Sequence, residues 1–153
     1  MSERFRSYLD DYATYHRDSR NKVTHYLGIP MIVLAIVCLL ARVPLGEVGG
    51  VSVDLALVVT IPVCLFYLSL NLFSGAAMTL LFALMYWTAP AIEVWLAWAL
   101  FVVGWVFQFV GHKFEGKSPA FFRNAVHLLI GPLWILNDLL AKCHLPAHQP
   151  KGA

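Results

Sequence analysis

The chain has 153 residues, of which 59% are hydrophobic and only 13% are charged, and its mean hydropathy is +0.69. A typical soluble domain carries about twice that share of charged residues, so the composition excludes an ordinary soluble protein. The length fits one domain, residues 1–153, that contains several membrane-spanning helices and a small polar region. The net charge of +2 comes without a dense basic run, so no nucleic-acid partner is expected.

The N-terminal part of the chain is polar and then becomes apolar. The first 25 residues mix acidic and basic side chains, which is typical of a polar helix and not of a secretory signal. The uncharged stretch that follows predicts a first membrane span over about residues 26–42. The segment Arg42–Asp54 contains a proline, three glycines and most of the nearby charges, so we expect a loop there.

Three more apolar regions follow this loop. The chain carries no charge over 38 residues, from Leu55 to Ile92, which is enough for two crossings, and a polar break near Asn71 divides them into spans at 55–73 and 75–91. Another uncharged run predicts a fourth span at 94–111. The last apolar segment, at 125–140, contains Gly131-Pro132, which should bend or break a helix.

These elements predict an all-α protein, namely an integral membrane four-helix bundle. It would have an N-terminal cytoplasmic helix and a C-terminal interfacial or half-inserted helix. Lysine and arginine residues concentrate before Tyr26 and after Gly111, whereas Arg42 is the single basic residue of the loop at 42–54. By the positive-inside rule, both chain ends are expected on the cytoplasmic face of a multi-pass protein, in a bacterial inner membrane or the endoplasmic reticulum.

The histidines are the main chemical signal. The sequence has six, and none lies in the middle of a predicted span. His16 and His25 precede the first span and His112 follows the fourth, so the predicted topology brings them to one cytoplasmic mouth. A single histidine at a membrane boundary is more often an interfacial residue. The convergence of three favours a metal site, and imidazole suits ferrous iron.

The spacing of these residues requires a turn. His16 and His25 are nine residues apart, which would place them on opposite sides of one continuous helix. We therefore expect the chain to turn between them, with Asn21 as the N-cap of a helix that starts at Lys22; a solvated loop residue is the alternative. His112 and Glu115 share a helical face, where the carboxylate would bind a metal or orient an imidazole. An exposed glutamate at a helix end is the more common explanation.

Two sequence blocks resemble a known family. They read YHRDSRNKVTHYLGIP at residues 15–30 and QFVGHKFEGKSPAFFRN at residues 108–124, and LIGPLW follows at 129–134. In order and spacing over nearly the whole chain, they are similar to the small integral-membrane family of 2-hydroxy fatty acid dioxygenases, which includes the enzyme of phytosphingosine breakdown. The resemblance implies an Fe(II)-dependent enzyme that uses O₂ to shorten a 2-hydroxy fatty acid by one carbon.

The same resemblance implies roles for individual residues. His16, His25 and His112 match the essential histidines of the family, so they are expected to bind Fe(II). Glu115 and Asn21 are candidate catalytic residues. His127 is a candidate fourth ligand, but this role does not come from the resemblance. His144 and His148, in the polar tail, are expected to be exposed to solvent.

The expected chemistry suits a membrane boundary. A 2-hydroxy acid can chelate a metal through its carboxylate and hydroxyl groups, and its oxidative decarboxylation releases the four electrons that O₂ accepts, so no 2-oxoglutarate is required. The tail would stay among membrane lipids. Aromatic residues near the histidines are candidates to line its entry or to anchor the protein at the interface; they are Phe5, Tyr8, Tyr12, Tyr15, Phe114, Phe121 and Phe122.

Two other functions stay open from the sequence. One is a non-enzymatic metal-binding membrane protein, although the predicted spans offer few polar groups for a path through the bilayer. The other is an iron-dependent lipid hydroxylase, a class whose di-iron members usually use more histidines than this chain has. The oligomeric state is left open.

Overall fold

The structure is a computed structural model, and it describes residues 1–119 and 124–149. The elements in chain order are α1 (Glu3–Ala13), α2 (Ser19–Leu40), β1 (Pro44–Val48), β2 (Val51–Asp54), α3 (Leu55–Leu70), α4 (Leu72–Thr88), the 3₁₀ turn η1 (Ala89–Ala91), α5 (Val94–Glu115) and α6 (His127–Lys142). The mostly helical character is confirmed, although a small β-hairpin makes the expected all-α class incomplete.

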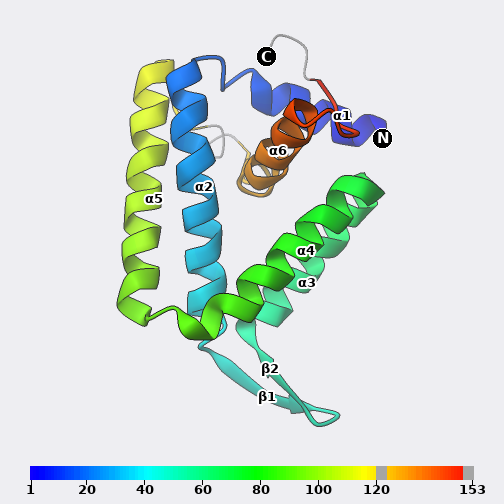
Figure 1. Cartoon of the computed structure of the whole chain (residues 1–153), viewed down its shortest axis with the longest axis vertical. Helices are drawn as coiled ribbons and strands as arrows, with labels where there is room; N and C mark the ends of the chain where they lie inside the picture. The colour runs from blue at the N-terminus through cyan, green and yellow to red at the C-terminus, as the bar shows by residue number, and fades with distance from the viewer. Residues whose placement is uncertain (120–123, 150–153) are drawn as a thin grey trace.

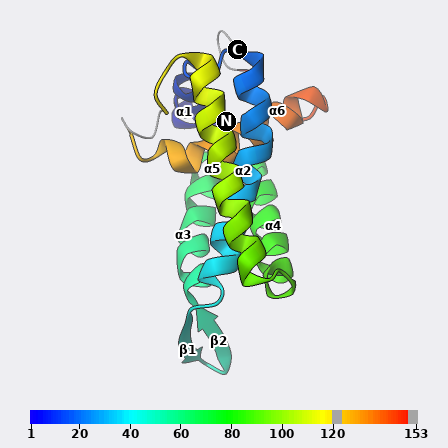
Figure 2. The ribbon, with the colours of Figure 1, turned by 90° about the vertical axis from the view of Figure 1, so that its left-hand side faces the viewer.

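The long helices form two pairs. Helices α2 and α5 run side by side, and α3 and α4 form a second pair that is inclined to the first (Figure 1). Both N- and C-terminal segments, with α1 and α6, lie at one end of the molecule, and the hairpin lies at the other (Figures 1 and 2). The main core joins buried side chains of α1, α2, α3, α4 and α6. We call the end that contains α1 and α6 the polar-helix end, after the polar helix α1, and the opposite end the hairpin end.

Among the residues that the structure describes, three helical segments are long and apolar enough to cross a membrane. They are Ser19–Leu40, Leu72–Ala91 and Val94–Glu115, with 22, 20 and 22 residues. Helix α3 is apolar but has 16 residues, slightly fewer than the roughly 17 to 25 of a typical spanning helix. The four-crossing arrangement and the cytoplasmic position of both ends stay predictions.

Close packing of α2 against α5 depends on two glycines. A Cβ atom on Gly28 would lie 2.7 Å from the carbonyl oxygen of Gly104, and a Cβ atom on Gly104 would lie 2.9 Å from the carbonyl oxygen of Gly28. The two backbones touch at this point because neither residue has a side chain. Small residues at helix interfaces allow this approach inside membranes. This contact sets how closely the histidine-bearing ends of α2 and α5 come together.

The predicted loop at 42–54 contains a β-hairpin, which corrects the sequence interpretation. Strands β1 and β2 are antiparallel, with Val48 opposite Val51 and a turn at Gly49 and Gly50. Both glycines have positive φ angles, of 60° and 80°, as a type I′ turn requires. The glycines were correctly associated with a turn, but the short strands on either side were missed.

Helix α6 also differs from expectation. The apolar helix expected at 125–140 is confirmed, and it is continuous from His127 to Lys142. Of the bend or break predicted at Gly131-Pro132, the break is therefore wrong. A proline inside a helix removes one i→i−4 hydrogen bond. The fully buried Leu133 and Trp134 anchor the helix in the core on the C-terminal side of Pro132, which explains why the helix persists.

The C-terminal tail folds back onto α1 and α6. The side chain of Asn137 makes two hydrogen bonds to the backbone of His148, at 2.6 and 2.8 Å. Nε2 of His148 lies 2.8 Å from Oδ1 of Asp10 on α1. The prediction of an exposed His148 is therefore wrong, because this imidazole bridges the tail to α1, whereas His144 is exposed as expected.

Candidate metal centre

Three histidines from distant parts of the chain converge at the polar-helix end. His16 lies between α1 and α2, His25 lies in the second turn of α2, and His112 lies near the end of α5. One ring nitrogen of each lies within 4.8 Å of the others, and all three side chains are buried. Their rings meet at interplanar angles of 72°, 65° and 83°. The convergence expected from the sequence is present.

Backbone carbonyl groups orient two of these imidazoles. Nδ1 of His16 lies 2.8 Å from the carbonyl oxygen of Tyr12, and Nδ1 of His25 lies 2.9 Å from the carbonyl oxygen of Asn21. A carbonyl only accepts hydrogen bonds, so each Nδ1 carries the proton and each neutral ring presents an Nε2 lone pair. Metal-binding histidines in proteins commonly donate their other ring N–H to a backbone carbonyl in this way.

The two Nε2 atoms face each other at 3.1 Å. With both Nδ1 atoms protonated, two lone pairs oppose each other, which is unfavourable unless a cation lies between them. Imidazole nitrogens about 2.1 Å from a divalent first-row ion stand about 3 Å apart when their bonds meet at a right angle. Nδ1 of His112 is buried without a hydrogen-bond partner. The three residues therefore fit a divalent metal ion.

Burial keeps His16 neutral. Desolvation lowers the pKa of His16 to about 3, and the ring stacks on Tyr12 with a centroid distance of 4.1 Å. A neutral imidazole has a free lone pair over the whole physiological pH range. His16 is thus held ready for metal coordination by stacking on one side and by a backbone carbonyl at Nδ1.

The turn between His16 and His25 is present, but its cap differs from the prediction. Helix α2 begins at Ser19, and Asp18 is its N-cap because its side chain accepts a hydrogen bond from the N–H of Arg20. Asn21 instead lies in the first turn of α2. Its carbonyl oxygen accepts from His25, and its amide Nδ2 donates to Glu115 at 2.9 Å. Asn21 therefore contacts the candidate site without capping the helix.

Glu115 ties the turn to α5. Its carboxylate accepts hydrogen bonds from the backbone N–H groups of Arg17 and Asp18, at 3.0 to 3.1 Å, and from the Asn21 amide. Arg17 and Asp18 directly follow His16 in the chain. Asn21 precedes His25 by one helical turn. Glu115 is not part of the three-histidine cluster. Its contacts hold the backbone around His16 and His25.

A glycine makes room for this arrangement on α5. A Cβ atom on Gly111 would overlap Oγ1 of Thr24 and would lie 2.5 Å from Oδ1 of Asn21 and 3.2 Å from Nδ1 of His25. The residue before His112 therefore needs to be glycine for α2 to approach α5 at the histidine level.

His127 lies near the cluster but outside it. At the start of α6, its Nε2 atom lies 2.9 Å from Oδ2 of Asp11 on α1, and its Nδ1 atom is buried without a partner. It does not belong to the group of nitrogens within 4.8 Å of one another. Among the predicted metal ligands, the structure brings together His16, His25 and His112 and leaves His127 beside them.

An apolar cavity of about 370 Å³ is lined in part by the three cluster histidines and by His127. Its wall includes Gln108, one turn before His112 on α5, whose Nε2 atom is buried without a hydrogen-bond partner. We did not select Gln108 from the sequence as a site residue. An amide inside an otherwise uncharged span is unfavourable unless it has a function or a partner, and this was the available signal.

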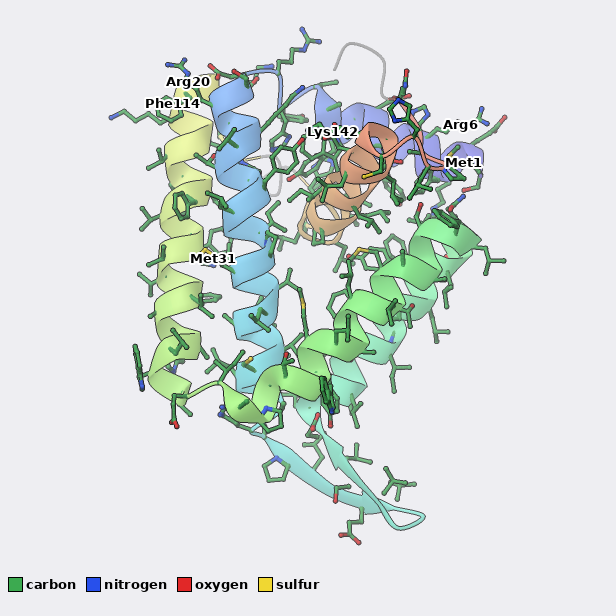
Figure 3. The ribbon with its side chains drawn as sticks, in the orientation of Figure 1. Met1, Arg6, Arg20, Met31, Phe114 and Lys142 are labelled. Carbon is green, nitrogen blue, oxygen red and sulfur yellow. The ribbon has the colours of Figure 1, made fainter. Side chains whose placement is uncertain are left out.

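The aromatic residues proposed for the tail entry divide into different groups. Tyr12 lines the cavity, whereas Phe5 is fully buried in the core. Phe114 lies under the guanidinium group of Arg20, 4.7 Å from it, at the end of the α2–α5 pair (Figure 3). Phe121 and Phe122 lie outside the described residues.

Fold and site together define a helical protein that has three helices able to cross a membrane and a buried three-histidine cluster. A family model described as 2-hydroxy-palmitic acid dioxygenase Mpo1-like matches residues 2–143. The chain is also 32% identical over 139 residues to the 2-hydroxy-palmitic acid dioxygenase MPO1 of Saccharomyces cerevisiae. The aligned region covers 90% of this chain and 80% of that protein. No solved structure matches the chain. The chain belongs to the Mpo1-like family, and the resemblance inferred from the sequence is confirmed.

Proposed function

We propose that this protein is an Fe(II)-dependent dioxygenase that converts a 2-hydroxy fatty acid and O₂ into the fatty acid one carbon shorter, CO₂ and water. Three buried imidazoles converge beside an apolar cavity, and this single feature carries the proposal. The name of the yeast relative, a 2-hydroxy-palmitic acid dioxygenase, supports the substrate class.

His16, His25 and His112 would hold the iron, whose open coordination positions would accept the substrate and O₂. The carbonyl oxygens of Tyr12 and Asn21 hold the Nδ1 protons of two ligands and keep their Nε2 lone pairs available. Gln108 and His127 have unpaired buried nitrogen atoms near this end of the cavity, so they are suited to hydrogen-bond the carboxylate and hydroxyl groups of the substrate. The apolar wall excludes water from these contacts.

The electron balance explains why no second substrate is proposed. Loss of the carboxyl carbon as CO₂ and oxidation of the hydroxyl-bearing carbon to a carboxylic acid release four electrons. These four electrons reduce one O₂ to two oxygen atoms at the oxidation level of water, which the carboxylic acid, CO₂ and water together account for. A reductase and 2-oxoglutarate are therefore unnecessary.

The test uses protein purified in detergent without oxygen and then supplied with Fe(II), O₂ and 2-hydroxyhexadecanoate. We expect pentadecanoate and CO₂ in equal amounts, with one O₂ consumed per turnover and no added 2-oxoglutarate. Hexadecanoate should not react because it lacks the hydroxyl group that completes the chelate and supplies electrons. Equal turnover of both acids would contradict the proposal, and a strict need for 2-oxoglutarate would favour a hydroxylase.

A matched variant separates the metal function from general damage. His25→Ala should abolish turnover, whereas His144→Asn should leave it unchanged because His144 is exposed in the tail. Asparagine is chosen because residue 144 has a positive φ angle of 59°, which asparagine tolerates well. Iron binding without any turnover of hydroxy acids would instead support a non-enzymatic metal-binding protein.

We also propose the setting of the reaction. The protein would be a multi-pass protein of a bacterial inner membrane or the endoplasmic reticulum, with the histidines at the cytoplasmic face. The clustering of basic residues before Tyr26 and after Gly111 supports this orientation. A fatty acid that enters from the cytoplasmic leaflet would then present its carboxylate at the level of the histidines, with its tail at the depth of the hydrocarbon layer.

A further inference from the structure

The cavity beside the histidines continues deep between the helices. On α2 its wall extends from His25 to Leu40, and on α5 from His112 back to Phe101. The ends of these stretches are fifteen and eleven residues apart, which at a rise of 1.5 Å per residue is about 22 and 16 Å. Half of the bilayer hydrocarbon core is about 15 Å thick, so the cavity is as deep as the acyl layer of one leaflet.

The polar groups of this cavity gather at one end. The four histidines and the unpaired amide of Gln108 lie at the polar-helix end. Farther in, the wall is made of aliphatic and aromatic side chains together with Thr60, whose hydroxyl already donates to the carbonyl oxygen of Ala56 at 2.7 Å. The cavity therefore complements a molecule with one polar head and a long apolar tail.

The deep end coincides with a closure of the bundle. Cys38 on α2, Ala89 on η1 and Ala97 on α5 are fully buried together. Arg42 reinforces this contact by donating hydrogen bonds to the carbonyl oxygens of Cys38 and Ile92. The elements α2, η1 and α5 therefore join close to Leu40, the last residue of α2 that lines the cavity.

We propose that the acyl tail of the substrate lies inside this cavity and that the depth of the cavity sets the preferred chain length. The last carbons of the tail would lie beside Leu40, Thr60 and Phe101. The proposal rests on the proposed function for the identity of the head group, but the position of the tail follows from the cavity itself.

The first experiment changes the depth. Val33 lines the cavity eight residues after His25, about 12 Å along the helix, and is only partly buried, so Val33→Phe should fill the middle of the cavity. We expect turnover of 2-hydroxyhexadecanoate to fall about tenfold or more relative to 2-hydroxydecanoate, the scale on which pockets discriminate by single methylene groups. Phe101→Ala should shift the preference towards longer acids.

A matched control adds the same ring outside the cavity. Val102 is next to Phe101, is 58% exposed and does not line the cavity, so Val102→Phe should leave the chain-length profile unchanged. If Val33→Phe binds iron normally and keeps the wild-type profile, the proposed depth control is wrong, while the dioxygenase function would stand.

The second experiment measures binding without turnover. A 2-hydroxy fatty acid that carries a diazirine at its terminal carbon is photolysed with the protein in detergent, and labelled peptides are identified by mass spectrometry. Labelling around Leu40 and Phe101 that excess 2-hydroxyhexadecanoate prevents would support the proposal, even if the wild-type protein had no activity. Labelling that competition does not reduce would overturn it.

Discussion

Asn21 and Glu115 are 94 residues apart in the chain, and the Asn21 amide donates a hydrogen bond of 2.9 Å to Oε2 of Glu115. The same carboxylate accepts from the backbone N–H groups of Arg17 and Asp18. Since the His25 imidazole is held by the Asn21 carbonyl, Glu115 contacts the backbone that carries the candidate metal ligands. We therefore infer that it is a positioning residue, and its partners define what its loss should do.

Glu115→Gln should therefore loosen the turn between α1 and α2. A glutamine side chain has one acceptor oxygen. Its NH₂ group is a donor, and it would face the backbone N–H groups whose hydrogen bonds the carboxylate now accepts. We expect the free energy of unfolding to fall by about 1 to 3 kcal/mol. Iron affinity should fall by about 10- to 100-fold, as for changes around other metal ligands. Thermal unfolding in detergent and iron analysis measure both effects.

The control for this variant is Glu93→Gln, because Glu93 is exposed and its side chain makes no cap hydrogen bond at the start of α5. If Glu115→Gln lost turnover with wild-type iron affinity and stability, the carboxylate would face the substrate and the positioning role would be wrong.

The same contact shows what the sequence could and could not provide. The nine-residue spacing of His16 and His25 required a turn, and the turn is present. The sequence predicted Asn21 as the cap, whereas the structure has Asp18, three residues earlier, and both residue types cap helices well. The choice depends on Glu115, because the Asn21 amide donates its hydrogen bond to this carboxylate. Glu115 lies on a helix far away in the chain. Such long-range partners cannot be inferred from local spacing.

The histidine variants test the ligand set. His16→Ala, His25→Ala and His112→Ala should each strongly reduce the iron content, because three nitrogens within 4.8 Å of one another form the cluster. His127→Ala should keep its iron and lower turnover, since His127 contacts Asp11 and lies outside that cluster. Iron analysis of anaerobically purified protein measures the outcome. Wild-type iron content in the variant lacking all three cluster histidines would refute the assignment.

Gly111→Ala tests the close approach of α2 to α5. The added methyl group would overlap Thr24 and press against Asn21, so the helices must separate or the side chains must move. Overpacking of this kind destabilises by about 1 to 3 kcal/mol. We expect reduced thermal stability and lower iron affinity because His25 and His112 are on the two helices that separate. Gly116→Asn, at an open position with positive φ, is a control that should change neither quantity.

The hairpin and the tail show a second limit of sequence reasoning. Gly49-Gly50 is a hairpin signal, but the flanking segments are short and lie in a region where charges and glycines favoured a loop. The sequence suggested that His148 is a solvated tail residue, because its partners Asp10 and Asn137 lie on α1 and α6. The uncharged runs located the apolar helices well, whereas contacts between helices depend on tertiary packing.

The hairpin also provides a test of topology. Val48 is 72% exposed at the end of β1, so a Val48→Cys variant in a background without Cys38, Cys64 and Cys143 should react with an impermeant maleimide from outside the cytoplasm. The matched Glu3→Cys variant, at the opposite end of the molecule, should react only after the membrane is permeabilised. Labelling of residue 48 solely from the cytoplasmic side would contradict the predicted orientation.

Gln108→Leu separates stability from activity. The Nε2 atom of Gln108 is buried without a hydrogen-bond partner, and an unpaired buried polar group is destabilising by about 1 to 3 kcal/mol. Leucine has a similar volume, so the variant should unfold at a higher temperature than the wild-type protein. If the amide hydrogen-bonds the polar end of the substrate, the same variant should raise KM for 2-hydroxyhexadecanoate while iron content stays unchanged. A more stable protein with wild-type kinetics would show that Gln108 does not contact the substrate.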